Sequence, residues 1–139
     1  MTDEFADLLT IIEDIISGNP DCHVVVGGAF NVDLFRTWTH AAMLDSFCIN
    51  LDLNTALRHH KCQIDYSYHF NLSRFNVLDH FLLSSTLYNK SFENIYVLHD
   101  ADNLSEHEPI VLQLLLDVFI VLASLPRFIH LCLMVESYR

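Results

Sequence analysis

The first twenty residues repeat apolar side chains with the spacing of one face of an α-helix. The residues that follow this spacing are Phe5, Leu8, Leu9, Ile12, Ile15 and Ile16. Thr2 can cap the helix, acidic residues occupy its first turn, and Gly18 and Pro20 end it. We therefore expect a helix over residues 2–17 that buries this face.

Residues 23–28 are mostly apolar and β-branched at consecutive positions, which is typical of a strand that is buried on both faces. The strand runs into the stretch Gly-Gly-Ala-Phe-Asn, residues 27–31. A buried strand that ends abruptly at polar residues presents side chains at the edge of a sheet.

The rest of the chain continues to alternate between helical and strand patterns. We expect a helix over residues 39–53, strands within 63–71 and 73–85 that form a pair joined near Asn71 to Arg74, and a short polar helix or loop at 85–94. Two further apolar segments, 94–100 and 110–116, read as strands separated by a polar loop at 101–109.

The segment from residue 117 to residue 139 changes character. Its apolar run is about as long as a membrane-spanning helix. Pro126, Arg127 and His130 interrupt it, and charge at mid-bilayer is costly. We therefore expect one domain over residues 1–116 and a divergent apolar extension over 117–139. We favour a buried or disordered extension over a membrane span.

Charge and cysteine content narrow the class of protein. Eighteen acidic residues against seven Lys and Arg give a net charge of -11, and the basic residues are scattered. Tight nucleic-acid binding needs clustered Lys and Arg, so the charge argues against a strong DNA binder. The four cysteines contain no C-x-x-C pair, and the N-terminus lacks the features of a signal peptide. We expect an intracellular protein with reduced thiols.

Polar side chains that can take part in catalysis lie near the ends of three predicted strands. Asn31 follows the first strand, Asp79 lies within 73–85, and His107 lies in the Ser-Glu-His-Glu-Pro segment before the last strand. Loops at strand ends are where catalytic groups collect. A carboxylate beside a histidine fixes the tautomer of the imidazole and makes it a better base.

The order of these motifs resembles a known family. Gly-Gly-x-Phe-Asn, then Ser-Arg-x-x-x-Leu-Asp-x-Phe-Leu-Leu-Ser, then Ser-acid-His-acid-Pro-Ile is similar to the C-terminal half of the endonuclease/exonuclease/phosphatase family. The chain looks closest to the endonuclease domain of non-LTR (LINE-type) retrotransposons. The resemblance implies an α/β (α+β) fold: the C-terminal half of a four-layer sandwich, with one mixed sheet and flanking helices. It also implies Mg²⁺-dependent hydrolysis of a phosphodiester, with DNA as the partner.

The resemblance assigns roles to individual residues. Asn31 matches the Asn of the family's Gly-Asp-Phe-Asn motif, which steadies the phosphate, and Ala29 stands where that motif has its Asp. His107 matches the His of the Ser-Asp-His motif, and Asp79 matches the acid that orients it. Glu106 replaces the Asp of that motif, so we expect it to be at most a weak metal ligand.

The same resemblance predicts that the chain has lost nuclease activity. The family's earlier half, with its metal-binding Glu, has no counterpart here, and Ala29 removes a carboxylate. We expect little or no nuclease activity, doubtful Mg²⁺ binding, weak DNA binding and self-association through exposed sheet. Two alternatives remain: a non-catalytic retroelement remnant, and a small interaction or membrane-associated protein with no enzymatic role.

Several residues have simpler interpretations. We expect Asp33, a loop residue, to be solvated, Phe75 to lie in the core, and Trp38 to pack at the start of a helix. His59, His60 and Cys62 lie close together, but their spacing matches no strong zinc pattern, so we expect a surface turn there.

Overall fold

The computed structural model describes residues 4–71, 74–99, 101–115 and 132–133. Its helices are α1 (Glu4–Ser17), α2 (Thr39–Asn50), α3 (Ser85–Lys90) and the 3₁₀ turn η1 (Ala56–Arg58). Its strands are β1 (Val25–Ala29), β2 (Leu53–Thr55), β3 (Cys62–Gln63), β4 (Tyr68–Phe70), β5 (Arg74–Asn76), β6 (Asp79–Ser84), β7 (Phe92–Val97), β8 (Ile110–Leu114) and β9 (Cys132–Leu133).

The described strands form three hydrogen-bonded sheets. Their orders are β2-β6-β1-β9, β3-β7-β8 and β4-β5. The first two sheets are mixed, because β9 runs parallel to β1 and β3 runs parallel to β7, whereas the other neighbours are antiparallel. The expected α+β class is confirmed. The strands nevertheless divide into separate sheets rather than the single mixed sheet that the sequence predicted.

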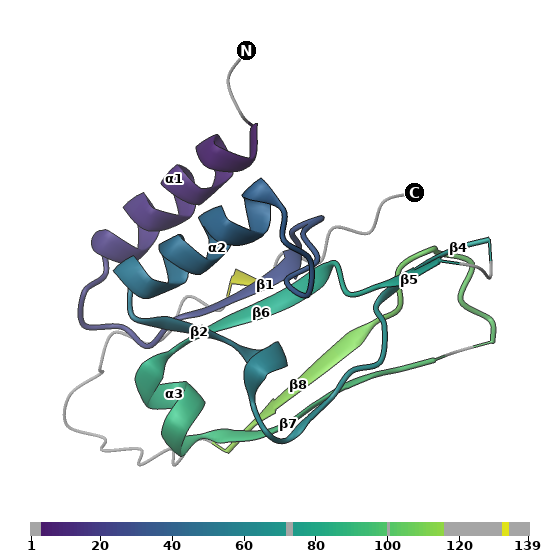
Figure 1. Ribbon diagram of the computed structural model, residues 1–139. Helices are drawn as coiled ribbons and strands as arrows, with labels where there is room; N and C mark the ends of the chain where they lie inside the picture. Colours follow the sequence, from purple (N-terminus) through teal and green to yellow (C-terminus); the bar gives the residue numbers. More distant parts are fainter. Residues whose placement is uncertain (1–3, 72–73, 100, 116–131, 134–139) are drawn as a thin grey trace.

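The sheet around β1 and β6 is covered by α1 and α2 on one face (Figure 1). Helix α1 buries much of the apolar face that its sequence predicted. Phe5 and Leu9 are buried, and Ile12 and Ile16 pack against the same cluster. From the sheet, Leu82 reaches this cluster with no exposed surface. Ile15 belonged to the predicted face, but it is 57% exposed.

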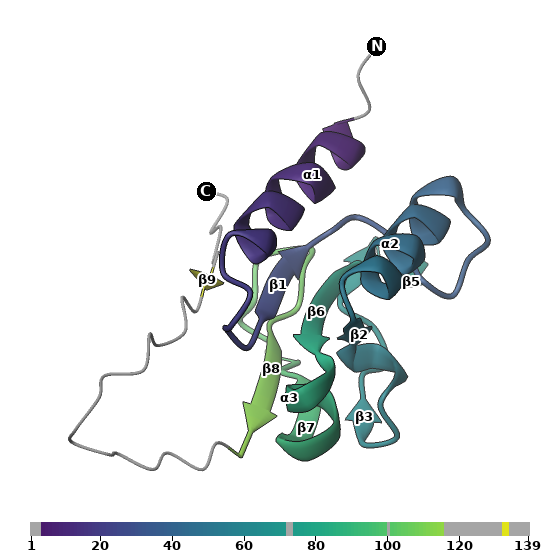
Figure 2. The ribbon, with the colours of Figure 1, turned by 90° about the vertical axis from the view of Figure 1, so that its left-hand side faces the viewer.

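The opposite face of the same sheet packs against β7 and β8 (Figure 2). Leu83 and Ile95 are fully buried at this contact, and Val25 packs against them. Successive residues of a strand point to opposite faces, so Val24 and Val26 pack on the helical side while Val25 packs on the other. Both faces of β1 are therefore covered, as the run of apolar residues predicted.

Gly27 allows β1 and β6 to pair closely. It lies opposite Phe81 in the antiparallel register. A Cβ at position 27 would lie 2.7 Å from Phe81 Cδ1, inside the range that packed carbon atoms occupy. The absence of a side chain at position 27 makes room for the aromatic ring of Phe81.

The ribbon of β4 and β5 extends away from the two larger sheets (Figure 1). Its antiparallel pairing is the one predicted, and Asn71 at the turn has a positive φ of 49°. The paired part is shorter than the alternating pattern indicated, because β4 begins at Tyr68 and leaves Ile64 and Tyr66 outside it. Asn tolerates the left-handed conformation better than most residues, which fits its place at the turn.

Most of the predicted apolar extension over 117–139 lies outside the described residues. Its described part is β9, which pairs parallel with Val26 and Gly27 of β1. Over the part of the chain that the structure describes, no helix is both long enough and apolar enough to cross a membrane. Thr2, the expected cap of the first helix, also lies outside the described residues.

We expect Gly27→Ala to destabilise the fold by about 1–3 kcal/mol, because the new methyl group would overpack the contact with Phe81. Phe81→Leu in the same chain should recover part of this loss, since it removes the atoms that clash. The free energies of unfolding of the four proteins in urea, taken as a double-mutant cycle, measure this coupling. Additive effects would contradict it.

Candidate functional site

The candidate site lies where β1 and β6 end side by side. The antiparallel register places Ala29 directly opposite Asp79. Directly opposed residues in such a pair carry their side chains on the same face, with Cβ atoms about 4.5–5.5 Å apart. The methyl group of Ala29 therefore occupies the place beside Asp79 where a longer side chain would present its functional group.

Asp79 and His107 are in contact, as their matched motifs predicted. Nδ1 of His107 lies 3.0 Å from Oδ2 and 3.2 Å from Oδ1 of Asp79. An ionised carboxylate only accepts hydrogen bonds, so we assign the proton to Nδ1, which leaves Nε2 of the neutral imidazole as an acceptor. The Asp79 side chain is 17% exposed and that of His107 is 37% exposed. The histidine is thus oriented by a shielded acid and still reaches the surface.

Main-chain hydrogen bonds hold the segment that carries His107. The His69 N–H donates to the carbonyl of Glu106 (2.9 Å), and the Glu108 N–H donates to the carbonyl of Ser67 (2.8 Å). These bonds form an isolated antiparallel bridge between Tyr68 and His107. The loop is therefore fixed against the start of the β4–β5 ribbon.

Two side chains from the same loop add local support around His107. The amide of Asn103 donates to the carbonyl of His107 (2.8 Å), and Oγ of Ser105 accepts from the His107 N–H (3.1 Å). The loop therefore fixes the backbone of His107 from both sides.

Ser67 organises the site and was missed by the sequence analysis. It is fully buried, and its Oγ accepts from the N–H groups of Leu78 and Asp79 at 3.0 and 3.1 Å. Its own carbonyl accepts from Glu108, the neighbour of His107. One residue, through its hydroxyl and its carbonyl, thus links the two chain segments that bring Asp79 and His107 together. No local pattern marks this serine, because its partners are eleven or more residues away.

Asn31 lies just beyond the end of β1, in the left-handed region with a φ of 54°. The Phe30 N–H donates to the carbonyl of Leu78, so the pairing with the chain before β6 continues past Ala29. Asn31 is exposed and lies two residues from Ala29. It therefore belongs to the same end of the sheet as Asp79, and the described hydrogen bonds do not include one between them.

His80 anchors the turn that carries Asn31. It is 1% exposed, and its Nε2 hydrogen-bonds the carbonyl of Val32. Burial lowers the pKa of His80 from its ordinary value, although the bond to Val32 and the charges of Asp79 and Asp33 act in the opposite direction. Nδ1 of the ring has no hydrogen-bond partner within the described residues. The neutral form, with its proton on Nε2, is the form that this site stabilises.

The carboxylates at this end of the sheet are already engaged by other side chains. Mg²⁺ takes oxygen ligands, but Asp79 accepts from His107, and Glu106 accepts from the Tyr68 hydroxyl at 3.1 Å. Among the described residues, no group of three or more His, Cys, Asp or Glu side chains could hold a metal ion. Metal binding by Glu106 stays a prediction.

Three expectations about neighbouring residues were wrong. Asp33 is 6% exposed rather than solvated, because its carboxylate accepts from the Phe35 N–H and pairs with Arg36 Nε at 3.2 Å. Phe75 is 51% exposed, since the ribbon that carries it extends away from the core. Trp38 is 52% exposed, and the guanidinium of Arg36 lies 5.3 Å from its ring centroid.

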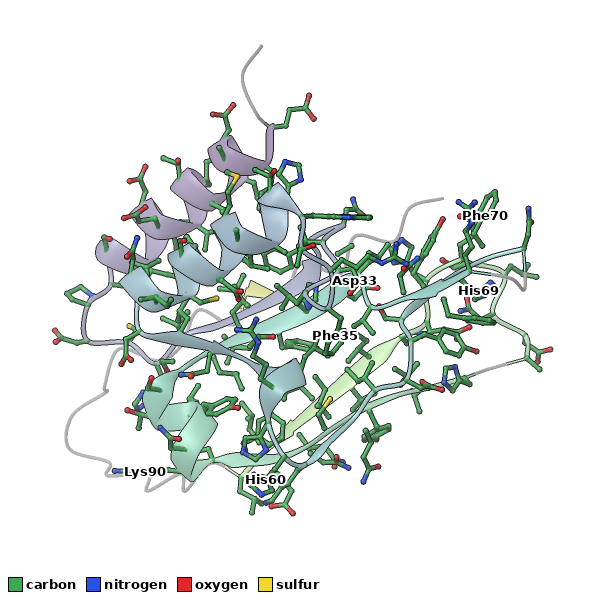
Figure 3. All side chains as sticks on the ribbon, viewed as in Figure 1. Asp33, Phe35, His60, His69, Phe70 and Lys90 are labelled. Atoms are coloured by element: carbon green, nitrogen blue, oxygen red, sulfur yellow. The ribbon has the colours of Figure 1, made fainter. Side chains whose placement is uncertain are left out.

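Aromatic and basic side chains are labelled at two opposite ends of the molecule in Figure 3. His69 and Phe70 lie on the ribbon, whereas His60 and Lys90 lie at the opposite end. At that end the ring of His59 stacks on two other aromatic rings. Its centroid lies 4.4 Å from that of His60 and 3.8 Å from that of Phe92. This packing accounts for the His59 and His60 pair without a metal.

The comparisons with known proteins establish the fold. No protein-family model and no curated protein sequence matches the chain. Among solved structures, the chain is similar to the crystal structure of an endonuclease/exonuclease/phosphatase family protein from Bacteroides thetaiotaomicron, with a TM-score of 0.58 and 18% sequence identity. The similarity covers 79% of this chain but 44% of that protein, so the chain spans less than half of the neighbour's length.

The expected fold of the endonuclease/exonuclease/phosphatase type is therefore confirmed for the described part of the chain. The likeness concerns the fold alone. It does not test the closer resemblance to LINE-type endonucleases, the site residues or the division at residue 116.

We expect Ser67→Ala to destabilise the fold by about 1–3 kcal/mol, because the two N–H groups that its Oγ accepts would lose their partner. The exposed Ser46→Ala is the matched control and should change stability by less than about 0.5 kcal/mol. Urea unfolding measures both. The His107 ring resonances, followed by NMR, should shift in the first variant alone; unchanged resonances would show that Ser67 does not position the pair.

We expect stability to fall as the pH drops below about 6.5, the ordinary pKa of histidine. The native state keeps His80 neutral while the unfolded chain takes up a proton, so the loss from this residue approaches about 1.4 kcal/mol per pH unit until the lowered pKa is reached. His80→Gln offers an amide donor near Val32 without titrating. Unfolding measured from pH 8 to pH 5 should show a smaller slope in this variant; equal slopes would place the titration elsewhere.

Proposed function

We propose that this chain derives from a phosphodiester hydrolase and keeps the acid–base half of its site. The observation that carries the proposal is the contact between Asp79 and His107 at 3.0 Å, next to the strand end that bears Ala29 and Asn31. The similarity in fold supports the same class. The ordered motifs further favour an endonuclease of the LINE type, with DNA as the substrate.

The proposed chemistry of the pair is general-base catalysis. Nδ1–H of His107 is directed at Asp79, so Nε2 can accept a proton from a water molecule that attacks phosphorus. Asp79 holds the ring in one tautomer and stabilises the imidazolium that forms. The exposed amide of Asn31, at the end of the same sheet, can donate to a phosphate oxygen.

We infer that the activity is low or absent because the second half of the site is missing. Ala29 provides no carboxylate beside Asp79, and Glu106 directs its own toward Tyr68. The resemblance implies that Mg²⁺ neutralises the phosphate, and the described residues include no cluster of three or more His, Cys, Asp or Glu side chains that would hold it without help from the substrate. Losing one acid–base group typically costs on the order of 10²–10⁴ in rate.

The charge of the chain lowers affinity for DNA as well. A net charge of -11 repels a phosphate backbone, and no cluster of Lys and Arg offsets it in the sequence. Arg36 is partly neutralised by Asp33, and Arg58 by Asp45 at 2.8 Å. We therefore propose at most weak and strongly salt-dependent binding to DNA.

The second candidate is a non-catalytic protein that keeps the fold. Ala29 favours it, because the substitution removes chemistry without disturbing the pairing of β1 with β6. The two candidates differ in what the Asp79–His107 pair does. In the first it still moves protons; in the second it only stabilises the loop.

We expect purified chain to show little or no nicking of supercoiled plasmid in Mg²⁺ or Mn²⁺. His107→Ala is the control that separates residual activity of this chain from a contaminating nuclease. Nicking by the wild type that disappears in the control would establish a working enzyme and overturn the expected loss. Nicking that persists equally in both proteins belongs to a contaminant.

Ala29→Asp, tested in the same assay, should not restore activity, because one carboxylate does not complete a metal centre. It should also destabilise the metal-free fold by about 0.2–1 kcal/mol at neutral pH, since it places a like charge directly opposite Asp79. Ala29→Asn is the uncharged control of similar size. Robust nicking by Ala29→Asp would show that the lost carboxylate alone explains the inactivity.

A further inference from the structure

Glu108 is a buried carboxylate on the far side of the loop that carries His107. Tyr68 and His107 form a strand-type bridge, and their ring centroids lie 5.0 Å apart. Successive side chains of an extended chain point to opposite sides. The next residue of each segment lies behind the bridge, where Nε2 of His69 is 3.4 Å from Oε1 of Glu108. Glu108 is 7% exposed, so little water reaches its charge.

Three segments of the chain converge on this carboxylate. His69 comes from β4, on the ribbon (Figure 3). Asn103 belongs to the same loop as Glu108, and its Nδ2 lies 3.3 Å from Oε2. His99 follows β7, and its Nδ1 lies 3.9 Å from the same oxygen. A buried charge is costly unless it is paired and hydrogen-bonded. These contacts therefore hold Glu108, and Glu108 ties the loop to β4 and to the end of β7.

The two histidines that face Glu108 are themselves fixed. Nε2 of His99 lies 2.9 Å from Oδ1 of Asp65. The ring of Tyr66 lies 4.5 Å from that of His99 and 6.4 Å from that of His69, measured between centroids. The segment before β4 therefore supports both histidines, and the carboxylate of Glu108 meets partners whose places are already set.

Asn103 connects Glu108 to His107. Its Oδ1 accepts from the Ser105 N–H at 3.0 Å, which assigns the orientation of the amide and leaves Nδ2 as the donor. Nδ2 donates to the carbonyl of His107 (2.8 Å) and to Oε2 of Glu108 (3.3 Å). An amide NH₂ group carries two protons, so both bonds form at once. Removing the carboxylate thus releases one of the partners that hold this amide against His107.

We propose that Glu108 is a positioning residue for the Asp79–His107 pair, which it holds through Asn103. Its described contacts do not include the side chain of either partner, but they set the loop backbone from which His107 reaches Asp79. N–H···O bonds span about 2.7–3.2 Å, and Nδ1 of His107 lies 3.0 Å from Oδ2 of Asp79. A small displacement of the loop therefore breaks this bond. The use of the pair in catalysis rests on the proposed function, whereas the position of His107 can be measured by itself.

The tautomer of the His107 ring reports this position. The tautomer of a neutral histidine follows the hydrogen bond that its ring makes, and the carboxylate of Asp79 favours the proton on Nδ1. Ring nitrogen chemical shifts, measured by NMR at about pH 8, above the ordinary pKa of histidine, give the ratio of the two tautomers. Glu108→Ala should lower the ratio of the Nδ1–H form to the Nε2–H form roughly tenfold, the usual effect of losing a hydrogen bond to a charged group.

Glu108→Gln and Asp33→Ala are the companion variants. The amide oxygen of glutamine still accepts from Asn103, so Glu108→Gln should give a ratio between those of the wild type and Glu108→Ala. Asp33 is as deeply buried, at 6% exposure, but it pairs with Arg36, which lies outside the loop. Asp33→Ala should therefore lower stability in urea without changing the His107 ratio. A wild-type ratio in both Glu108 variants, or an equal change in Asp33→Ala, would overturn the proposal.

Asn103→Ala tests the route of the effect and does not require Glu108→Ala to fold. It should lower the same ratio, and adding Glu108→Gln to it should change the ratio little further, because both substitutions break one chain of contacts. Additive changes would contradict the route through Asn103. A wild-type His107 ring that does not prefer Nδ1–H would contradict the proposed function as well, whereas a preference that survives every variant contradicts only the role of Glu108.

Discussion

The antiparallel pairing of β1 with β6 is the interaction on which the rest of the structure depends. It joins five consecutive residue pairs, from Val25 opposite Leu83 to Ala29 opposite Asp79. Leu82 faces the helices and Leu83 faces β7 and β8, so the same two strands contribute to both apolar cores. The register that buries these leucines is also the register that sets Asp79 beside Ala29. A shift of one residue would reverse every side chain between the two cores.

The sequence predicts the parts of this arrangement that depend on local pattern. The spacing of Phe5 and Leu9 identifies α1, and the apolar run before Ala29 identifies a strand with two covered faces. The order of the motifs also predicts that Asp79 and His107 meet, because both residues lie near strand ends of one fold. The structure shows this contact. What local pattern does not contain is the division of the strands into separate sheets. That division depends on which edges meet, and pairings between distant segments leave no periodic signal.

Polar contacts that no hydrophobic periodicity marks explain the residues that were missed or misassigned. Ser67 is a small polar residue in an alternating segment, and only the fold brings its hydroxyl to Leu78 and Asp79. Asp33 lies in a loop sequence typical of solvated acids, yet the turn buries it and supplies its partners. Buried polar groups are nearly always satisfied, but the identity of the partner is a property of the three-dimensional arrangement.

An alanine at position 29, where the resemblance implies a carboxylate, is compatible with a well-ordered fold for a physical reason. Asp79 is held by His107 and by the hydrogen bonds of Ser67, and none of these contacts passes through Ala29. A second carboxylate directly opposite Asp79 would add like-charge repulsion that only a bound cation could offset. Alanine avoids this repulsion and keeps the strand pairing. Catalytic sites commonly store such destabilising charge, so an uncharged side chain at position 29 spares the fold the repulsion that a carboxylate there would add.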